Sequence, residues 1–299
     1  MKDNRKRSWV GYLAGIGAGV SYGVNPLFAK GLLEHGVAIH SMLFFRYVLA
    51  MLMMLILLTM RHESVRVRPR QIPMLLFMGV MFAMSSEGLF LAYKYIPAGL
   101  ATTIVYLYPI FSAIILVCLG QRPSWQSWTA IAGTLAGVAL ICMPAGGVTL
   151  NALGIFFSAT SALAYALYLV MVNTSKRISD VPSDIITMFS LLSGCVMFLI
   201  LSHTDGDHSL MQGISGLDDW LNLAGLGLFP TMISMLCIAI STRRIGPAKT
   251  GILGVFEPLT AILVGLVVFG ETLTTSVITG TTLAILSVLF LFLTKHRNG

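Results

Sequence analysis

Charged residues are scarce in this chain. Asp, Glu, Lys and Arg together make up 10% of its 299 residues, whereas an ordinary soluble domain carries about 25%. Hydrophobic residues make up 56%, and the mean hydropathy is +0.86. So little polar surface cannot cover a water-facing globule. The composition therefore excludes an ordinary soluble domain and indicates a chain whose outer surface faces lipid.

Cysteine is also rare, and motifs of catalysis are missing. The four cysteines, Cys118, Cys142, Cys195 and Cys237, lie in apolar runs without metal-ligand spacing, so we expect reduced, buried thiols. The six histidines lie at the ends of such runs or in loops, and no HExxH motif, nucleophile elbow or P-loop is visible. We expect no enzyme, no ATP-driven pump, no metal and no cofactor. The loop His203–His208 lacks the length and terminal acid of a calcium loop and fits a solvated loop better.

Long apolar runs are what the chain does have, and runs of about 20 residues favour transmembrane helices over a barrel. The first follows basic residues, as in a signal peptide, but continues through Gly31, so we expect an uncleaved span. We mark off ten segments, approximately 9–31, 39–60, 71–93, 98–119, 125–143, 151–172, 184–203, 219–242, 248–269 and 275–294. The predicted fold is an all-α membrane protein with ten transmembrane helices.

Lys and Arg predict the orientation, because they concentrate in cytoplasmic loops. With ten spans, both ends of the sequence lie on one side, and nearly all of the 19 Lys and Arg residues fall there. Only Lys30 and Lys94 fall on the opposite side, and Arg46 lies inside a span. We predict a multi-pass protein of the inner (plasma) membrane with cytoplasmic termini. The net charge of +7 is then a topology signal, and nucleic-acid binding is not expected.

Two pairs of stretches suggest an internal repeat. "GYLAGIGAGVSYG" (Gly11–Gly23) resembles "GIFFSATSALAYA" (Gly154–Ala166), and "YPIFSAIILVCLGQRPS" (Tyr108–Ser124) resembles "EPLTAILVGLVVFGETLTT" (Glu257–Thr275). We predict two five-helix repeats, residues 1–147 and 148–299. Because five is odd, the second repeat crosses the membrane in the opposite sense. Inverted repeats of this kind are typical of secondary transporters, whose substrate site lies between the halves.

Several stretches resemble the drug/metabolite transporter superfamily, specifically its EamA-type branch. They are "SYGVNPLFAK" (Ser21–Lys30), "RYVLA" (Arg46–Ala50), "YIPAGLATTIVYLYPIFSAII" (Tyr95–Ile115) and "IGPAKTGILGVFEPLTAILVGLVVFGETLT" (Ile245–Thr274). The last is the most specific, because it carries the Glu–Pro of the ninth helix and the Gly–Glu that closes it. The resemblance covers nearly the whole chain.

The sequence departs from the family pattern in two places. Gln121 stands where the pattern usually has Glu, and Tyr22–Gly23 stands where the first helix commonly has Trp–Gly. Family members export amino acids and other small metabolites, and related branches carry nucleotide sugars and small cationic drugs. The resemblance thus implies solute transport by alternating access without naming the solute.

Glu257 is the most informative polar residue, because it lies in the middle of an apolar segment. A carboxylate at the centre of a membrane helix costs roughly 2.5–3.5 kcal/mol, so the side chain should face the bundle interior, either protonated or paired with a cation. Pro258 removes a backbone donor and leaves a carbonyl one turn earlier free. Two interpretations remain open: a substrate-amine or proton-coupling site, or a carboxyl that clamps a neighbouring helix.

Arg46 and Glu87 are the other intramembrane charges, on neighbouring segments. The simpler interpretation is a salt bridge between them. The alternative is that Arg46 meets a substrate carboxylate or changes partners during gating, with Glu87 as a gating group.

Aromatic and polar residues in corresponding spans form a candidate pocket. Tyr22 and Asn25 lie three apart on one helix face, and Tyr165 and Tyr168 repeat this spacing in the second half. They either line a pocket for an amphipathic solute or pack between helices.

Segment 98–119 offers a further polar face, with Thr102 and Tyr106 on one side. Tyr108–Pro109 in this segment corresponds to Glu257–Pro258 in the repeat. Glycines at positions 11, 15, 19 and 23 recur every fourth residue, which predicts a surface for close helix packing.

The sequence as a whole predicts a secondary transporter that exports small metabolites such as amino acids. The partners would be a small solute, protons and the lipid bilayer. The alternatives are a membrane-embedded enzyme or a non-transporting membrane subunit. The predicted substrate-binding residues are Tyr22, Asn25, Arg46, Tyr106, Tyr165, Tyr168 and Glu257, and the predicted coupling or gating residues are Glu257, Pro258 and Glu87.

Overall fold

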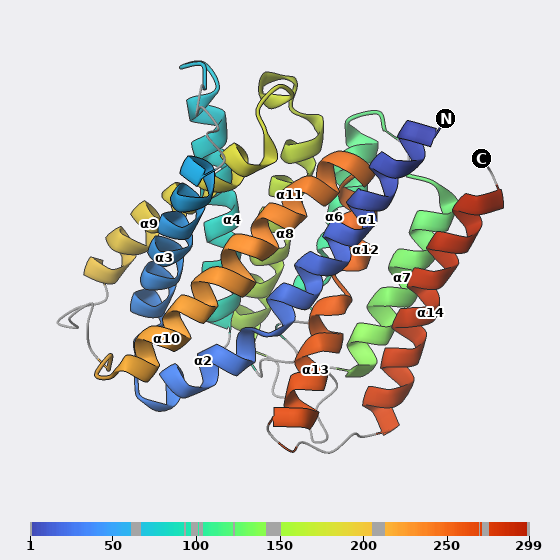
Figure 1. Ribbon diagram of the computed structural model, residues 1–299. Coiled ribbons are helices and arrows are strands. Elements are labelled where there is room, and N and C mark those ends of the chain that lie inside the picture. Colours follow the sequence, from blue (N-terminus) through green and yellow to red (C-terminus); the bar gives the residue numbers. More distant parts are fainter. Residues whose placement is uncertain are drawn as a thin grey trace.

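In the computed structural model the chain folds into helices, and its described residues include no strand (Figure 1). The structure describes residues 2–60, 67–92, 94–96, 101, 104–121, 123–141, 151–204, 213–268, 270 and 275–297. Thr102 and residues 205–208 of the predicted loop lie outside this part, as does the side chain of Pro258. The all-helical class is confirmed for the residues described.

The helices are divided between the two halves of the sequence. Those of the first half are α1 (Lys2–Gly23), α2 (Asn25–Glu34), α3 (Ile39–Met60), α4 (Ile72–Ala92), α6 (Tyr108–Cys118) and α7 (Trp125–Ile141). Those of the second half are α8 (Ala152–Thr174), the 3₁₀ turn η1 (Lys176–Ile178), α9 (Ser183–Thr204), α10 (Leu217–Leu226), the π-helical turn η2 (Gly227–Ile233), α11 (Ser234–Ile245), α12 (Pro247–Leu253), α13 (Phe256–Val268) and α14 (Thr275–Arg297).

Within the part of the chain that the structure describes, five helical stretches are long and apolar enough to cross a membrane. They are α3, α4, α8, α9 up to His203, and the continuous run α10–η2–α11 (Leu217–Ile245). Each coincides with one of the ten predicted segments. The other segments contain helices that are shorter, interrupted or charged at one end, so the count of ten spans stays a prediction. Both labelled termini lie at the same end of the molecule (Figure 1).

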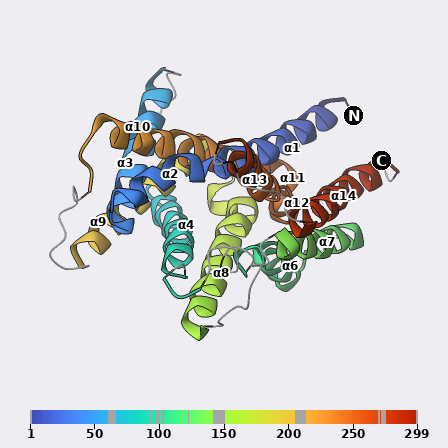
Figure 2. The ribbon, with the colours of Figure 1, turned by 90° about the horizontal axis from the view of Figure 1, so that it is seen from below.

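Helices of one half pack mainly against helices of the other. α3 packs on α9, α4 packs on α8 and α9, and α1 packs on α11 and α13. α7 and α14 pair along their length at one edge of the molecule (Figures 1 and 2). The buried core therefore forms largely between the two halves.

Among the described residues, three helical breaks inside the predicted spans occur just before prolines. α1 ends at Gly23 and α2 begins at Asn25, next to Pro26. Turns also interrupt the helix at Tyr106–Leu107, before Pro109, and at Gly254–Val255, before Pro258. Proline lacks an N–H and leaves the carbonyl four residues earlier without its helical donor. These breaks place backbone carbonyls that lack their usual helical donor inside the bundle.

The predicted glycine surface on α1 packs closely against the second half. A Cβ at Gly15 would lie 2.9 Å from the Ser241 hydroxyl oxygen, and one at Gly19 would lie 2.8 Å from Cβ of Phe256. At Gly23 an added Cβ would lie 2.5 Å from the Glu257 carbonyl oxygen. Any side chain on this face would push α1 away from α12 and α13, so the prediction of close packing is confirmed.

We expect Gly23→Ala to lower the free energy of unfolding by about 1–3 kcal/mol, the usual cost of overpacking. The reason is that the new methyl group meets the Glu257 backbone, which cannot move as a side chain can. Gly17→Ala is the matched control on the same helix, since its Cβ would meet only Cys237 Sγ at 3.8 Å. That change should be neutral or stabilise by about 0.5–1 kcal/mol. Thermal unfolding in detergent measures both, and equal midpoints for the two variants would contradict the expected close contact.

Candidate functional site

A cavity of about 70 Å³ lies between helices of the two halves. This volume accommodates several water molecules. Its polar and glycine lining from the first half consists of Gly15, Gly19, Tyr22, Ser85, Ser86, Tyr106 and Tyr108. The corresponding lining from the second half consists of Tyr165, Ser234, Thr250, Gly254 and Glu257. Four of the predicted site residues thus line one space: Tyr22, Tyr106, Tyr165 and Glu257.

The two broken helices meet at this cavity. The Tyr106 hydroxyl donates to the Gly254 carbonyl oxygen at 2.8 Å, and the Tyr108 hydroxyl donates to that of Gly251 at 3.0 Å. Gly254 is four residues before Pro258, so its carbonyl lacks the usual helical donor. The Glu257 N–H, at 2.9 Å, and the Tyr106 hydroxyl replace it. The breaks before Pro109 and Pro258 are therefore bonded to each other.

Glu257 lies in the first turn of α13, immediately after the break, and its side chain lines the cavity. The N-terminus of a helix favours a negative charge at this position. Tyr106 lies within hydrogen-bonding reach of the carboxyl, and Arg46 interacts with it electrostatically. The prediction that Glu257 faces the bundle interior is confirmed.

Aromatic rings form a continuous wall beside Glu257. The ring centroids of Tyr106 and Tyr108 are 5.9 Å apart, and Tyr108 meets Tyr165 edge to face at 4.6 Å. Phe82 continues the wall at 5.8 Å from Tyr165. Edge-to-face pairs at these separations are favourable beyond the apolar area that they bury. The wall is therefore a well-packed aromatic surface.

Arg46 lies behind the cavity wall, and the predicted salt bridge with Glu87 is wrong. The Arg46 guanidinium is 2% exposed and donates to the Thr231 hydroxyl and, at 3.2 Å, to the Pro230 carbonyl oxygen. Its Cζ atom is 5.4 Å from the centre of the Tyr22 ring. Arg46 thus binds the π-helical turn η2 of the second half. The sequence pattern did not reveal this turn, which presents a carbonyl and a hydroxyl to the guanidinium.

Glu87 pairs instead with a histidine. Its Oε1 atom lies 2.7 Å from Nε2 of His40, and both side chains are largely buried. A second pair, His35 Nδ1 with Asp219 Oδ1 at 2.6 Å, joins the segment before α3 to α10. Neither histidine was predicted to have a role, since both lie at span ends where a solvated side chain is common.

Two further predicted residues lie outside the cavity lining. Tyr168 is fully buried, one turn beyond Tyr165, and packs on Phe82 with centroids 5.0 Å apart. Asn25 lies just past the break after α1, and its Oδ1 atom is buried without a hydrogen-bond partner among the described residues. A spacing of three residues indicates a shared helix face, but only one member of each pair, Tyr22 and Tyr165, lines the cavity.

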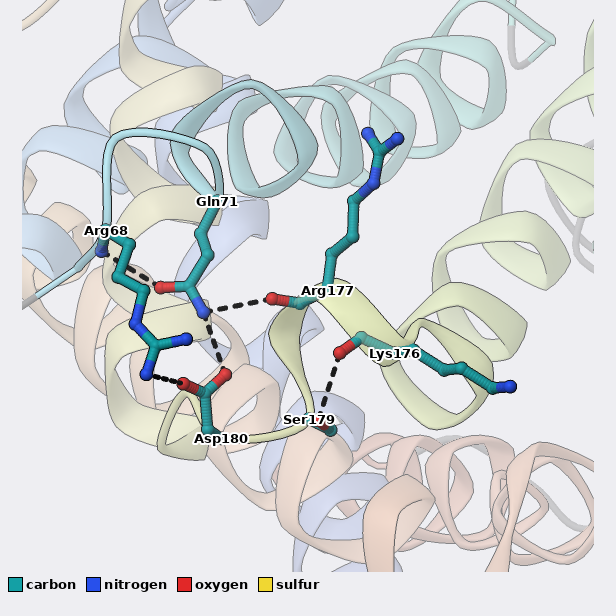
Figure 3. Close-up of polar contacts among 6 residues, drawn as sticks. All are labelled: Arg68, Gln71, Lys176, Arg177, Ser179 and Asp180. Carbon is teal, nitrogen blue, oxygen red and sulfur yellow. Dashed lines mark hydrogen bonds and ion pairs between the residues drawn. The ribbon is translucent and has the colours of Figure 1, made fainter.

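Polar contacts join the two halves between the start of α4 and η1 (Figure 3). The start of α4 lies at the end of the molecule that carries the termini (Figure 1). The Gln71 amide donates to the Arg177 carbonyl oxygen at 2.9 Å and to Asp180 at 2.8 Å. Asp180 also pairs with Arg68 at 3.7 Å, and Arg243 donates to the Ile178 carbonyl oxygen at 2.6 Å. We call the contacts of Arg68, Gln71, Asp180 and Arg243 the termini-side network. It holds α4, η1 and α11 together.

Known proteins resemble this chain along most of its length. A 29% identical protein of Archaeoglobus fulgidus, called an uncharacterized transporter, aligns over 64% of this chain and 66% of its own length. The uncharacterized transporter YdfC of Bacillus subtilis is 25% identical over 83% of this chain and 79% of its own. The uncharacterized inner membrane transporter YedA of Escherichia coli is 24% identical over 60% of this chain and 56% of its own.

A solved crystal structure has the same fold, with a TM-score of 0.82 at 18% identity, over 96% of this chain and 98% of that one. The model of the EamA-like transporter family matches residues 9–143 and 152–293. Together with the membrane-spanning helices, these matches show that the protein is a multi-pass membrane protein that belongs to the EamA-like transporter family.

Proposed function

We propose that the protein is a secondary transporter that exports small metabolites by alternating access, with the cavity at Glu257 as its solute site. The observation that carries this proposal is the position of Glu257. It lines a polar and aromatic space between the halves, at the point where two helices are broken and bonded to each other. Transporters of this general design bind solutes at such discontinuous helices.

Residues 1–147 and 148–299 would be the two inverted repeats of this mechanism. Two separate matches to the family model, one in each half, support the division. The cavity would open to the side of the termini when the termini-side network breaks, and to the other side when it forms. The Lys and Arg distribution supports cytoplasmic termini and an inner-membrane location.

Each site residue would have a role that follows from its position. Tyr22, Tyr106 and Tyr165 would contact the solute, and Glu257 would bind it or a proton in exchange. Pro258 would keep the helix deformable at the break. Arg46, from behind Tyr22, would support the wall, and Glu87 with His40 would join α3 to α4.

Untargeted metabolomics of cells and medium, with and without this protein, tests the proposal. We expect at least one small solute to rise in the medium and fall in the cells without chemical change. A new compound in the medium would favour the membrane-embedded enzyme instead. No change in any solute would favour a non-transporting subunit.

A further inference from the structure

We infer that the cavity selects small organic ammonium ions that carry no carboxylate, and discriminates against amino acids. This inference rests on the proposed function, because it names the solute class of the same site. It is carried by the hydrogen-bonding character of the cavity wall.

Hydroxyl protons in the wall are largely taken up by the protein itself. Tyr108 donates to the Gly251 carbonyl oxygen, Ser234 to that of Ala18 at 3.1 Å, and Thr250 to that of Gly246 at 2.9 Å. Tyr106 has two acceptors within reach, the Gly254 carbonyl and the Glu257 carboxyl. A hydroxyl has one proton, so each of these groups has only lone pairs left for a solute.

Acceptors therefore prevail over donors in the wall. An ammonium group has three donors and no acceptor, which matches a wall of hydroxyl oxygens and one carboxylate. A solute carboxylate needs donors, and among the described lining residues there is no Lys, Arg or His. Tyr22 and Tyr165 contribute phenol groups, which are neutral and do not offset the repulsion between a solute carboxylate and Glu257.

The aromatic wall strengthens this preference. Tyr106, Tyr108, Tyr165 and Phe82 surround the space beside Glu257, and a desolvated cation is attracted to the faces of such rings. Arg46 does not line the cavity. Its Nε and Nη2 atoms donate to Thr231 and Pro230, and its guanidinium lies over the ring of Tyr22, which does line the cavity. Arg46 is therefore not placed to receive a solute carboxylate.

Four compounds that share a 3-methylbutyl chain test the inference: 3-methylbutylamine, leucine, 4-methylpentanoate and 3-methylbutanol. Each is titrated at neutral pH into the purified full-length protein in nanodiscs, with binding measured by calorimetry. We expect the amine to bind at least about tenfold more tightly than the other three, since a hydrogen bond to a charged group is stronger than a neutral one. Glu257→Gln should abolish the preference for the amine over the alcohol. Glu34→Gln, the same change at an exposed carboxylate of α2, should preserve it.

The inference is overturned if leucine or the acid binds as tightly as the amine, if none of the four binds, or if Glu257→Gln keeps the preference. Flux of the amine from proteoliposomes separates this result from the proposed function. Binding without flux would contradict the proposed function and leave the inference standing. Flux of other solutes without amine binding would overturn the inference and leave the proposed function standing.

Discussion

Replacing Glu257 by glutamine abolishes solute export while the protein still folds; this is the largest effect that we expect. The carboxylate lines the cavity at the break between α12 and α13, and glutamine keeps its size but removes its charge. Removing one partner of a buried charge pair costs about 2–5 kcal/mol, which corresponds to a loss of at least about thirtyfold in export. Export into the medium, normalised to the amount of protein in the membrane, is the measurement.

Glu34→Gln provides the control for this experiment, because Glu34 is exposed at the end of α2. It should export like the unchanged protein. The Tyr106 hydroxyl has the Gly254 carbonyl as a second acceptor, so Glu257→Gln should unfold at nearly the same temperature. Normal export by a folded Glu257→Gln variant would remove the carboxylate from the mechanism and leave Glu257 a structural clamp.

The second large effect is expected for Arg46→Met, and it is an effect on stability. The guanidinium is buried and satisfies both the Thr231 hydroxyl and the Pro230 carbonyl of the π-helical turn. The change leaves the Pro230 carbonyl oxygen without this donor, whereas the Thr231 hydroxyl still donates to the Leu226 carbonyl oxygen. Leaving a buried polar group unsatisfied costs about 1–3 kcal/mol, and we expect a loss of at least this size. Thermal unfolding in detergent, followed by circular dichroism, measures it.

Two comparisons identify the cause of that loss. Arg46→Lys keeps the charge but not the two-pronged donor geometry, and it should fall between the unchanged protein and Arg46→Met. Arg244→Met removes an exposed arginine at the end of α11 and should have little effect. If Arg46→Met and Arg244→Met unfold at the same temperature, Arg46 does not hold the π-helical turn as described.

The sequence was sufficient to predict part of the cavity lining, namely Tyr22, Tyr106, Tyr165 and Glu257, but not that Asn25, Arg46 and Tyr168 lie outside it. Glu257 could be placed because a carboxylate in an apolar segment avoids lipid, and the glycines of α1 because their four-residue period marks one face. The same reasoning brought Tyr22, Tyr106 and Tyr165 to one cavity. These predictions depend on helical periodicity, on the internal repeat and on the cost of burying charge.

The hydrogen-bond and ion-pair partners of Arg46 and Glu87 could not be predicted in the same way. Arg46 was expected to pair with Glu87, but helix rotation and the π-helical turn give it Thr231 and Pro230 instead. His40 pairs with the Glu87 carboxylate instead, because the start of α3 lies beside the part of α4 that carries Glu87. Such pairings depend on axial shifts of a few ångströms between helices, which no pattern within a single helix records. Likewise, only the assembled structure shows to which acceptor each cavity hydroxyl donates its proton.

Alternating exposure of the cavity is tested most directly by labelling one cysteine from both sides of the membrane. The variant Ser85→Cys places a thiol on the cavity wall, in a protein whose four native cysteines are replaced by alanine. A membrane-impermeant maleimide is applied to each side of oriented vesicles. We predict labelling from both sides, with faster labelling from the side of the termini when Gln71→Leu weakens the termini-side network. Labelling from one side alone, unchanged by Gln71→Leu, would contradict a transporter that opens to each side in turn.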